Sequence, residues 1–143
     1  MHYFDIITIL CIGLMVGTEF AVSAFINPVV WQLEETTQAK ILSLFARLLG
    51  KVMPFWYALS LVLMLIETYL RRHEPALPSL LTAAGIWIAA IIFSITVLVP
   101  INNRIAALED GWRQQNKHWD TLHRWRIFLL VAAMALLLHG ILQ

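Results

Sequence analysis

The stretch V-P-I-N-N-R-I-A-A-L-E-D-G-W-R-Q-Q-N-K-H-W-D-T-L-H-R-W-R, from Val99 to Arg126, is the only long polar passage in an otherwise apolar sequence. It holds five of the ten Lys and Arg residues, two of the five His, three of the six Trp and three Asn. The sequence on either side consists mainly of apolar runs long enough to cross a membrane. We therefore interpret the rest of the chain as a scaffold that holds this segment at one membrane surface.

The composition indicates an integral membrane protein. Of the 143 residues, 60% are hydrophobic and 13% are charged, and the mean hydropathy is +0.76. A soluble domain carries about 25% charged residues, so this chain is too apolar to cover its surface in water. The net charge of +1 gives no reason to expect a nucleic acid as partner. The single cysteine, Cys11, excludes an intrachain disulfide and a cysteine-based metal site.

Four apolar segments are long enough to cross a bilayer, because a transmembrane helix needs about 20 mostly apolar residues. They cover approximately residues 4–30, 53–70, 77–99 and 122–142. Their short connections predict an all-α fold, an antiparallel bundle of four membrane-spanning helices in a single domain of residues 1–143. A short interfacial amphipathic helix, ending at Gly50, is expected at 37–49 after the first span. A helical extension, broken near Gly111, is expected after the third span.

The distribution of Lys and Arg predicts the orientation in the membrane. Of these ten residues, only Arg71 and Arg72 lie between the second and third spans. The other eight lie in or beside the first and third connections. By the positive-inside rule, these two connections face the cytoplasm and both termini lie outside.

The first span contains a carboxyl group, Glu19, where a charge costs roughly 2.5–3.5 kcal/mol on insertion scales. Glu19 is therefore expected to face the bundle interior or to be protonated. Asn27 lies two turns further along roughly the same face. Gly13, Gly17 and Ala21 form a face of small residues, and Gly17 lies about 160° around the helix from Glu19. This face packs either on a neighbouring helix or on a second copy of the chain.

Antiparallel threading brings polar residues from all four spans to one membrane face. Glu19 lies roughly 12 Å deeper than this face, since a helix rises 1.5 Å per residue. Trp119, His123 and Arg126 share one helix face, at positions i, i+4 and i+7. The sequence therefore predicts a funnel-shaped ligand pocket with an aromatic rim, a polar collar and a carboxylate beneath.

Structural roles explain several of these residues equally well. Trp119 and Arg126 have the character of interfacial anchors, and Asn102 and Asn103 could satisfy backbone groups near Pro100. No metal site is expected. His118 and His123 are five residues apart, which departs from the i, i+4 spacing of paired helical ligands.

Four motifs carry a family resemblance. They are G-T-E-F-A-V-S-A-F-I-N-P (Gly17–Pro28), M-P-F-W-Y-A-L (Met53–Leu59), V-P-I-N-N-R (Val99–Arg104) and W-D-T-L-H-R-W-R (Trp119–Arg126). In this order, over nearly the whole chain, they resemble the small four-span membrane family that includes the fungal anthrone oxygenases, and its bacterial branch in particular. The resemblance implies a bacterial inner-membrane protein. It also implies oxidation, without a cofactor, of an anthrone or a similar polycyclic phenolic or quinone-like molecule to a quinone.

Such an oxidation needs a base, because removal of a proton from a phenolic anthrone gives an electron-rich carbanion that reacts directly with oxygen. His123 is the expected base, since imidazole titrates near neutral pH, and Arg126 or the two asparagines would stabilise the enolate oxygen. The expected catalytic residues are His123, Arg126, Asn102, Asn103 and Glu19, and the expected substrate-binding residues are Trp119, Trp112, Trp56 and Asn27.

Two other classes of function fit the same sequence. One is a non-catalytic membrane protein that binds a lipid or quinone, or packs against a partner through the G-x-x-x-G face. The other is a transporter in which Glu19 relays a proton, although four short spans would have to oligomerise to form a pathway.

Overall fold

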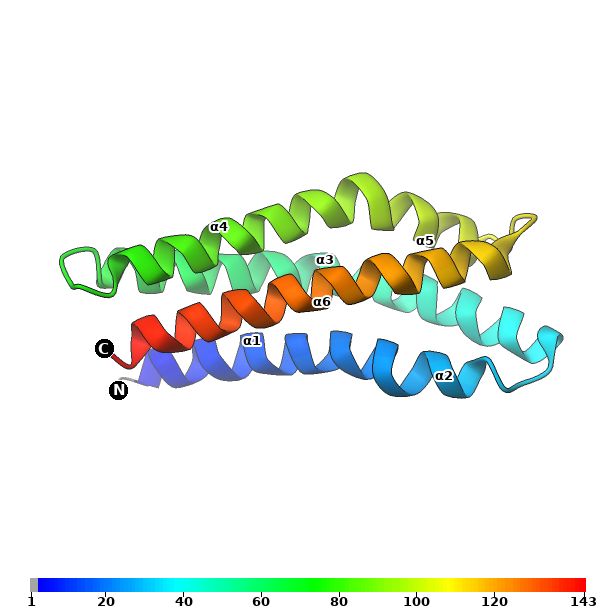
Figure 1. Ribbon diagram of the computed structural model, residues 1–143, viewed down its shortest axis with the longest axis horizontal. Coiled ribbons are helices and arrows are strands. Elements are labelled where there is room, and N and C mark those ends of the chain that lie inside the picture. Colours follow the sequence, from blue (N-terminus) through cyan, green and yellow to red (C-terminus); the bar gives the residue numbers. More distant parts are fainter. Residues whose placement is uncertain (1–2) are drawn as a thin grey trace.

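Four long helical segments run antiparallel in the computed structural model, which describes residues 3–143 (Figure 1). The first comprises α1 (Tyr3–Ala21), the π-helical turn η1 (Val22–Ile26) and α2 (Asn27–Val30), and the second is α3 (Glu35–Leu70). The third comprises α4 (Leu77–Phe93), η2 (Ser94–Leu98) and α5 (Val99–Ala106), and the fourth is α6 (Trp112–Ile141). No strand occurs in this part of the chain, and the predicted all-α four-helix bundle is confirmed.

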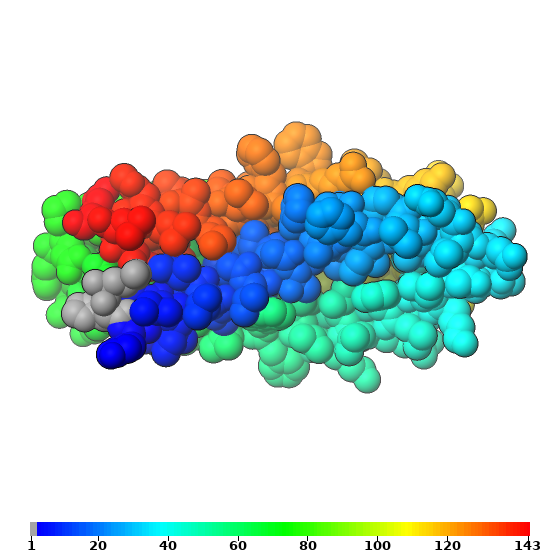
Figure 2. Space-filling view, turned by 90° about the horizontal axis from the view of Figure 1, so that it is seen from below, coloured from blue at the N-terminus to red at the C-terminus, as the bar shows by residue number. Residues whose placement is uncertain are grey.

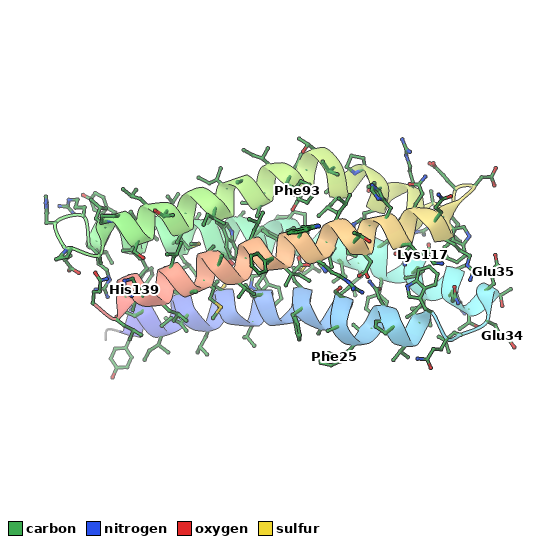
Figure 3. The ribbon with its side chains drawn as sticks, viewed as in Figure 1. Phe25, Glu34, Glu35, Phe93, Lys117 and His139 are labelled. Atoms are coloured by element: carbon green, nitrogen blue, oxygen red, sulfur yellow. The ribbon has the colours of Figure 1, made fainter. Side chains whose placement is uncertain are left out.

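All four segments are long and apolar enough to cross a membrane, and the chain is a multi-pass membrane protein. Large apolar side chains cover the outside of the bundle, among them Phe25, which points away from it in Figure 3 and is 64% exposed. Glu34, Glu35 and Lys117 lie at the end of the bundle opposite to the termini (Figure 3). The apolar bundle therefore has one strongly polar end.

The helices are longer than the membrane is thick. They contain 28 to 36 residues, which corresponds to about 42–54 Å, against a hydrocarbon core of about 30 Å. Counting about 20 residues per span from the end that holds the termini places the far boundary of the core near Val22, Lys51, Thr96 and Leu122. Beyond this boundary the bundle continues as a polar projection.

Residues 37–49 are helical as expected, but they form the beginning of α3, which continues without a break through Gly50 and Pro54. The prediction of a separate interfacial helix that ends at Gly50 is therefore wrong. The reason is packing: a Cβ on Gly50 would lie 3.3 Å from the amide nitrogen of Asn102. Asn102 uses the same amide to donate a hydrogen bond to the carbonyl of Ala46, 3.0 Å away. Gly50 is a contact point for α5 rather than a helix end.

The fourth helix begins earlier than expected, at Trp112 rather than near Leu122. The predicted break at Gly111 is confirmed, because this glycine has a φ of 78°, a left-handed conformation that glycine adopts at no steric cost. Residues 112–121 therefore belong to α6 and do not continue the extension of the third segment.

Two π-helical turns interrupt the first and third segments, each beginning six residues before a proline, Pro28 or Pro100. Proline donates no backbone hydrogen bond and its ring crowds the carbonyl four residues earlier, and a wider turn relieves both problems. The first helix accordingly continues through Pro28 to Val30. In Figure 1 the α4–η2–α5 segment arches outward near its middle.

The core is packed most closely between α4 and α6. Trp87, Ala83 and Leu130 are fully buried there, and a Cβ on Gly140 would lie 2.7 Å from Cδ2 of Leu80. The third span contains several small residues, among them Ala83 and Ala90, which predict close helix contact. Both are fully buried, and α4 and α6 form the tightest helix pair of the bundle.

A buried ion cluster joins α1 to the C-terminal end of α3. Arg71 lies 3.1 Å from a carboxylate oxygen of Asp5 and 3.5 Å from one of Glu67. Both carboxylate residues are buried, and Glu67 is fully so. The sequence predicts a solvated Glu67, because this residue lies near the end of the second span beside Arg71. This prediction is wrong, since α1 covers Glu67 and brings Asp5 beside the same arginine.

Candidate functional site

Glu19 lies at the centre of a buried polar cluster to which several helices contribute. Its Oε2 accepts a hydrogen bond from Nη2 of Arg126 on α6, at 2.7 Å. Its Oε1 accepts one from the hydroxyl of Tyr57 on α3, at 3.0 Å. In Figure 2, α1 lies between α6 and α3 on this face of the bundle, which is consistent with partners for Glu19 on both of these helices. The expectation that Glu19 faces the bundle interior is confirmed.

Arg126 connects Glu19 to the third segment. Its Nη1 donates to the hydroxyl of Ser94, the first residue of η2, at 3.0 Å. Its guanidinium carbon lies 5.4 Å from the centre of the Tyr57 ring. Both Glu19 and Arg126 are buried, so each charge depends on the other for compensation.

The hydrogen bonds of His123 determine its tautomer. A guanidinium group can only donate, so Nδ1 of His123, which lies 2.9 Å from Nη2 of Arg126, must accept. The ring proton is then on Nε2, which donates to the backbone carbonyl of Glu19 at 3.1 Å. His123 is fully buried and stacks on Trp119, with ring centroids 4.5 Å apart. A neutral imidazole thus holds Glu19 and Arg126 in position.

A cavity of about 460 Å³ lies beside this cluster, which is within the range of small-molecule sites, about 300–1,000 Å³. Its polar lining includes Glu19, Tyr57, Ser94 and Arg126, which form one side of an otherwise largely apolar chamber. The remaining lining residues are Val22, Leu49, Gly50, Met53, Pro54, Ala58, Leu61, Ile91, Ile95, Leu98, Val99, Asn102, Asn103 and Trp119.

The cavity brings together five of the residues expected from the sequence: Glu19, Asn102, Asn103, Trp119 and Arg126. His123 does not belong to the lining; it lies behind Arg126 and Trp119. The face shared by Trp119, His123 and Arg126 exists as predicted, but only its two outer members reach the cavity.

Three expected ligand-binding residues lie elsewhere. The indole of Trp56 donates to the carbonyl of Cys11 at 3.1 Å, and Trp56 packs, partly buried, against the main core. Trp112 packs on a second apolar cluster, near the polar end. Asn27 donates to Oδ1 of Asp120 at 2.7 Å.

Asp120 is a polar centre of its own. Its i, i+4 spacing with Arg124 predicts a solvated ion pair on the helix surface, and this prediction is only half right. The pair exists, at 2.9 Å, and the arginine is exposed, but Asp120 is buried. It also accepts hydrogen bonds from Ser23 and Asn27, at 3.0 and 2.7 Å. These bonds fasten α6 to the first segment directly beside η1.

Tyr57 and Ser94 are the members of the site that sequence reasoning missed. In the sequence, Tyr57 follows Trp56 at the start of the second span, which predicts only an aromatic belt at the membrane interface. Ser94 is one hydroxyl within a long apolar run. The only sequence signal for both residues was a polar group inside a predicted span. That signal identifies a site residue only once the Glu19–Arg126 ion pair is known to lie beside it.

Two buried nitrogens beside the cavity have no hydrogen-bond partner among residues 3–143: Nε of Arg126 and Nε1 of Trp119. Both atoms are closed off from solvent, so a ligand in the cavity would meet the other polar atoms of the lining rather than these two. Within the same range, no group of three or more His, Cys, Asp or Glu side chains is arranged to hold a metal ion. The site offers hydrogen-bond donors, one carboxylate and apolar walls.

Comparison with known proteins adds one match. A family model described as anthrone oxygenase matches residues 42–136, about two thirds of the chain. The matched range contains Tyr57, Ser94 and Arg126, but not Glu19. No curated protein and no solved structure matches the chain.

Proposed function

The chain belongs to the anthrone oxygenase family, and on this premise we propose that its cavity binds a flat phenolic polycycle and oxidises it with molecular oxygen, without a cofactor. The observation that carries the proposal is the Glu19–Tyr57–Arg126 arrangement on one side of an apolar cavity of about 460 Å³. It combines a proton acceptor with hydrogen-bond donors, which is what this oxidation requires.

The reaction can be written with these groups. Glu19 accepts a proton from the ring methylene, and the resulting enolate oxygen is stabilised by the Arg126 guanidinium. The carbanion gives electrons to oxygen, a carbon–oxygen bond forms, and the product is a hydroperoxide. Loss of the remaining hydrogen on that carbon then breaks the oxygen–oxygen bond. One oxygen atom stays as the quinone carbonyl, and the other leaves as water with both methylene hydrogens.

This proposal gives the first proton transfer to Glu19 rather than to His123. The carboxylate lines the cavity, whereas His123 is fully buried behind it. His123 contributes as a positioning residue, because its Nδ1 accepts a hydrogen bond from the same Arg126 nitrogen that binds Glu19. Trp119 supplies a flat apolar wall, and Asn102 and Asn103 supply polar contacts at the other side of the cavity.

The proposal is tested with purified protein in lipid nanodiscs, supplied with an anthrone. We expect quinone absorbance to rise and oxygen to be consumed, one molecule for each quinone. The matched control is Glu67→Gln, which alters a buried carboxyl group near the opposite end of the bundle and should keep the wild-type rate. If the rate does not exceed that of empty nanodiscs while quinone still binds, the oxygenase proposal is refuted and the protein is a non-catalytic quinone-binding protein.

A second candidate function is helix packing against a partner, because one member of the small-residue face points outward. A Cβ on Gly13 would contact Met134 within the bundle, at 3.2 Å, whereas one on Gly17 would meet nothing within 4 Å. A second copy of the chain is the proposed occupant, through Gly17 and Ala21. Cross-linking in native membranes should give a dimer that Gly17→Leu abolishes; an unchanged dimer would exclude this face.

We also propose that the protein lies in a bacterial inner membrane with its polar end in the cytoplasm. Both chain ends lie at the other end of the bundle (Figure 1), and eight of the ten Lys and Arg residues belong to the segments at or beside the polar end. A cysteine introduced at Glu109 should react with a membrane-impermeant reagent only after the membrane is opened.

A further inference from the structure

The cavity has an opening on the side of the bundle. Six of its lining residues are exposed, and they form two rows with a spacing of four residues: Gly50, Pro54 and Ala58 on α3, and Ile95, Val99 and Asn103 on η2 and α5. Residues four apart lie on one side of a helix. The two rows therefore rim a slot between α3 and the arched third segment, whereas Glu19, Tyr57, Ser94 and Arg126 are buried at its inner side.

The slot faces lipid over much of its length. Pro54, Ala58 and Ile95 fall within the hydrocarbon core when about 20 residues are counted for each span, while Gly50 and Asn103 lie at or beyond its boundary. The neighbouring outward side chain on α3, Phe55, is 80% exposed and suited to contact with acyl chains. Water reaches only the polar end of such an opening.

The two rims differ in bulk. The α3 rim consists of a hydrogen, a proline ring and a methyl group, and the opposite rim of Ile95, Val99 and Asn103. The α3 row runs from Gly50 to Ala58, eight residues apart, so the opening extends about 12 Å along the helix. An elongated opening suits a flat molecule that enters edge first, and an oxygen at its leading edge then meets the polar groups of the inner side.

We infer that the cavity is filled from the bilayer through this slot, by a flat membrane-dissolved molecule that enters with an acceptor oxygen foremost. That the ligand is a substrate rests on the proposed function, but its entry through the slot does not. Ala58 and Ile95, which belong to the two rims within the hydrocarbon core, then determine which molecules pass.

The test measures uptake of anthraquinone, added to protein in nanodiscs, from the rate at which it quenches tryptophan fluorescence. Ala58→Phe should slow this rate at least about tenfold, which corresponds to a barrier about 1.4 kcal/mol higher. The control is Leu59→Phe, one residue along α3 and exposed but outside the cavity lining, and it should leave the rate unchanged. Ile95→Ala widens the opposite rim and should accelerate uptake, so the inference stays testable if Ala58→Phe folds poorly.

Equal rates for Ala58→Phe, Ile95→Ala and the wild type would overturn the inference. So would a phospholipid that co-purifies with the wild type and is lost in Ala58→Phe while quinone uptake stays the same, since a lipid chain would then occupy the slot. Uptake of the quinone requires no turnover. If quinone uptake depends on the rim residues but the protein oxidises no anthrone, only the proposed function is refuted. If the protein oxidises anthrone, and Ala58→Phe and Ile95→Ala do so at the wild-type rate, only the entry route through the slot is refuted.

Discussion

Replacement of Arg126 by methionine should lower the free energy of unfolding by about 3–5 kcal/mol, the usual cost of removing one partner of a buried ion pair. The loss arises because Glu19 would remain buried without its 2.7 Å partner. Ser94 and His123 would also lose a hydrogen-bond donor. Unfolding of the detergent-solubilised protein by denaturant, followed by circular dichroism, measures the change.

The control for this experiment is Arg113→Met, because Arg113 forms an exposed ion pair with Glu35 at 3.5 Å. Exposed pairs contribute about 0–1 kcal/mol, so this variant should unfold almost as the wild type does. The double variant Glu19→Gln/Arg126→Met removes both charges and should recover part of the loss. Equal unfolding of Arg126→Met and Arg113→Met would show that the buried pair contributes nothing to stability.

The approximate depth of the polar groups could be predicted from the sequence. A helix rises a fixed distance per residue, so antiparallel threading predicted Asn102, Asn103 and Arg126 at one membrane face with Glu19 about 12 Å beneath them. The structure brings all four to one cavity, but Arg126 contacts Glu19 directly, at 2.7 Å. The i, i+4, i+7 spacing likewise predicted that Trp119 and Arg126 share a face, and both line the cavity.

The rotation of each helix about its own axis could not be predicted in the same way. In a membrane, the lipid-facing and the inward-facing surfaces are both apolar, so hydrophobic periodicity gives little information about which side faces inward. Glu67 and Asp120 were expected in solvent for this reason, and both are buried. Trp56 was chosen for the pocket over its neighbour Tyr57, although it is Tyr57 that reaches Glu19.

The π-helical turns are a second reason why the rotation of the helices could not be predicted. Each shifts the helix that follows it around its axis, and η2 begins with the serine that Arg126 binds. Proline signals a disturbed helix, but whether the chain ends, bends or widens depends on what packs beside it. The same holds for Gly50, where the neighbouring Asn102 decides that α3 continues.

Glu19→Gln should reduce the rate of anthrone oxidation by about 10²–10⁴, the typical contribution of a general base, while anthraquinone binding stays within about threefold. The amide keeps an oxygen that can accept from Tyr57 or Arg126, but it cannot take up the substrate proton. It also leaves the buried Arg126 charge without a counter-charge, so circular dichroism first establishes that the variant is folded and the rate is expressed per folded protein. Oxygen consumption measures the rate in nanodiscs, and fluorescence quenching measures the binding.

Comparison of Glu19→Gln with His123→Ala decides which group is the base. If His123 only positions the ion pair, its alanine variant should lose less activity than Glu19→Gln, and the lost activity should not depend on imidazole added to the solution. If Glu19→Gln keeps most of the activity while His123→Ala loses it, the proton goes to the imidazole. The buried ring would then have to exchange its hydrogen bond with Arg126 for one with the substrate, because at present Nδ1 is occupied by that donor at 2.9 Å.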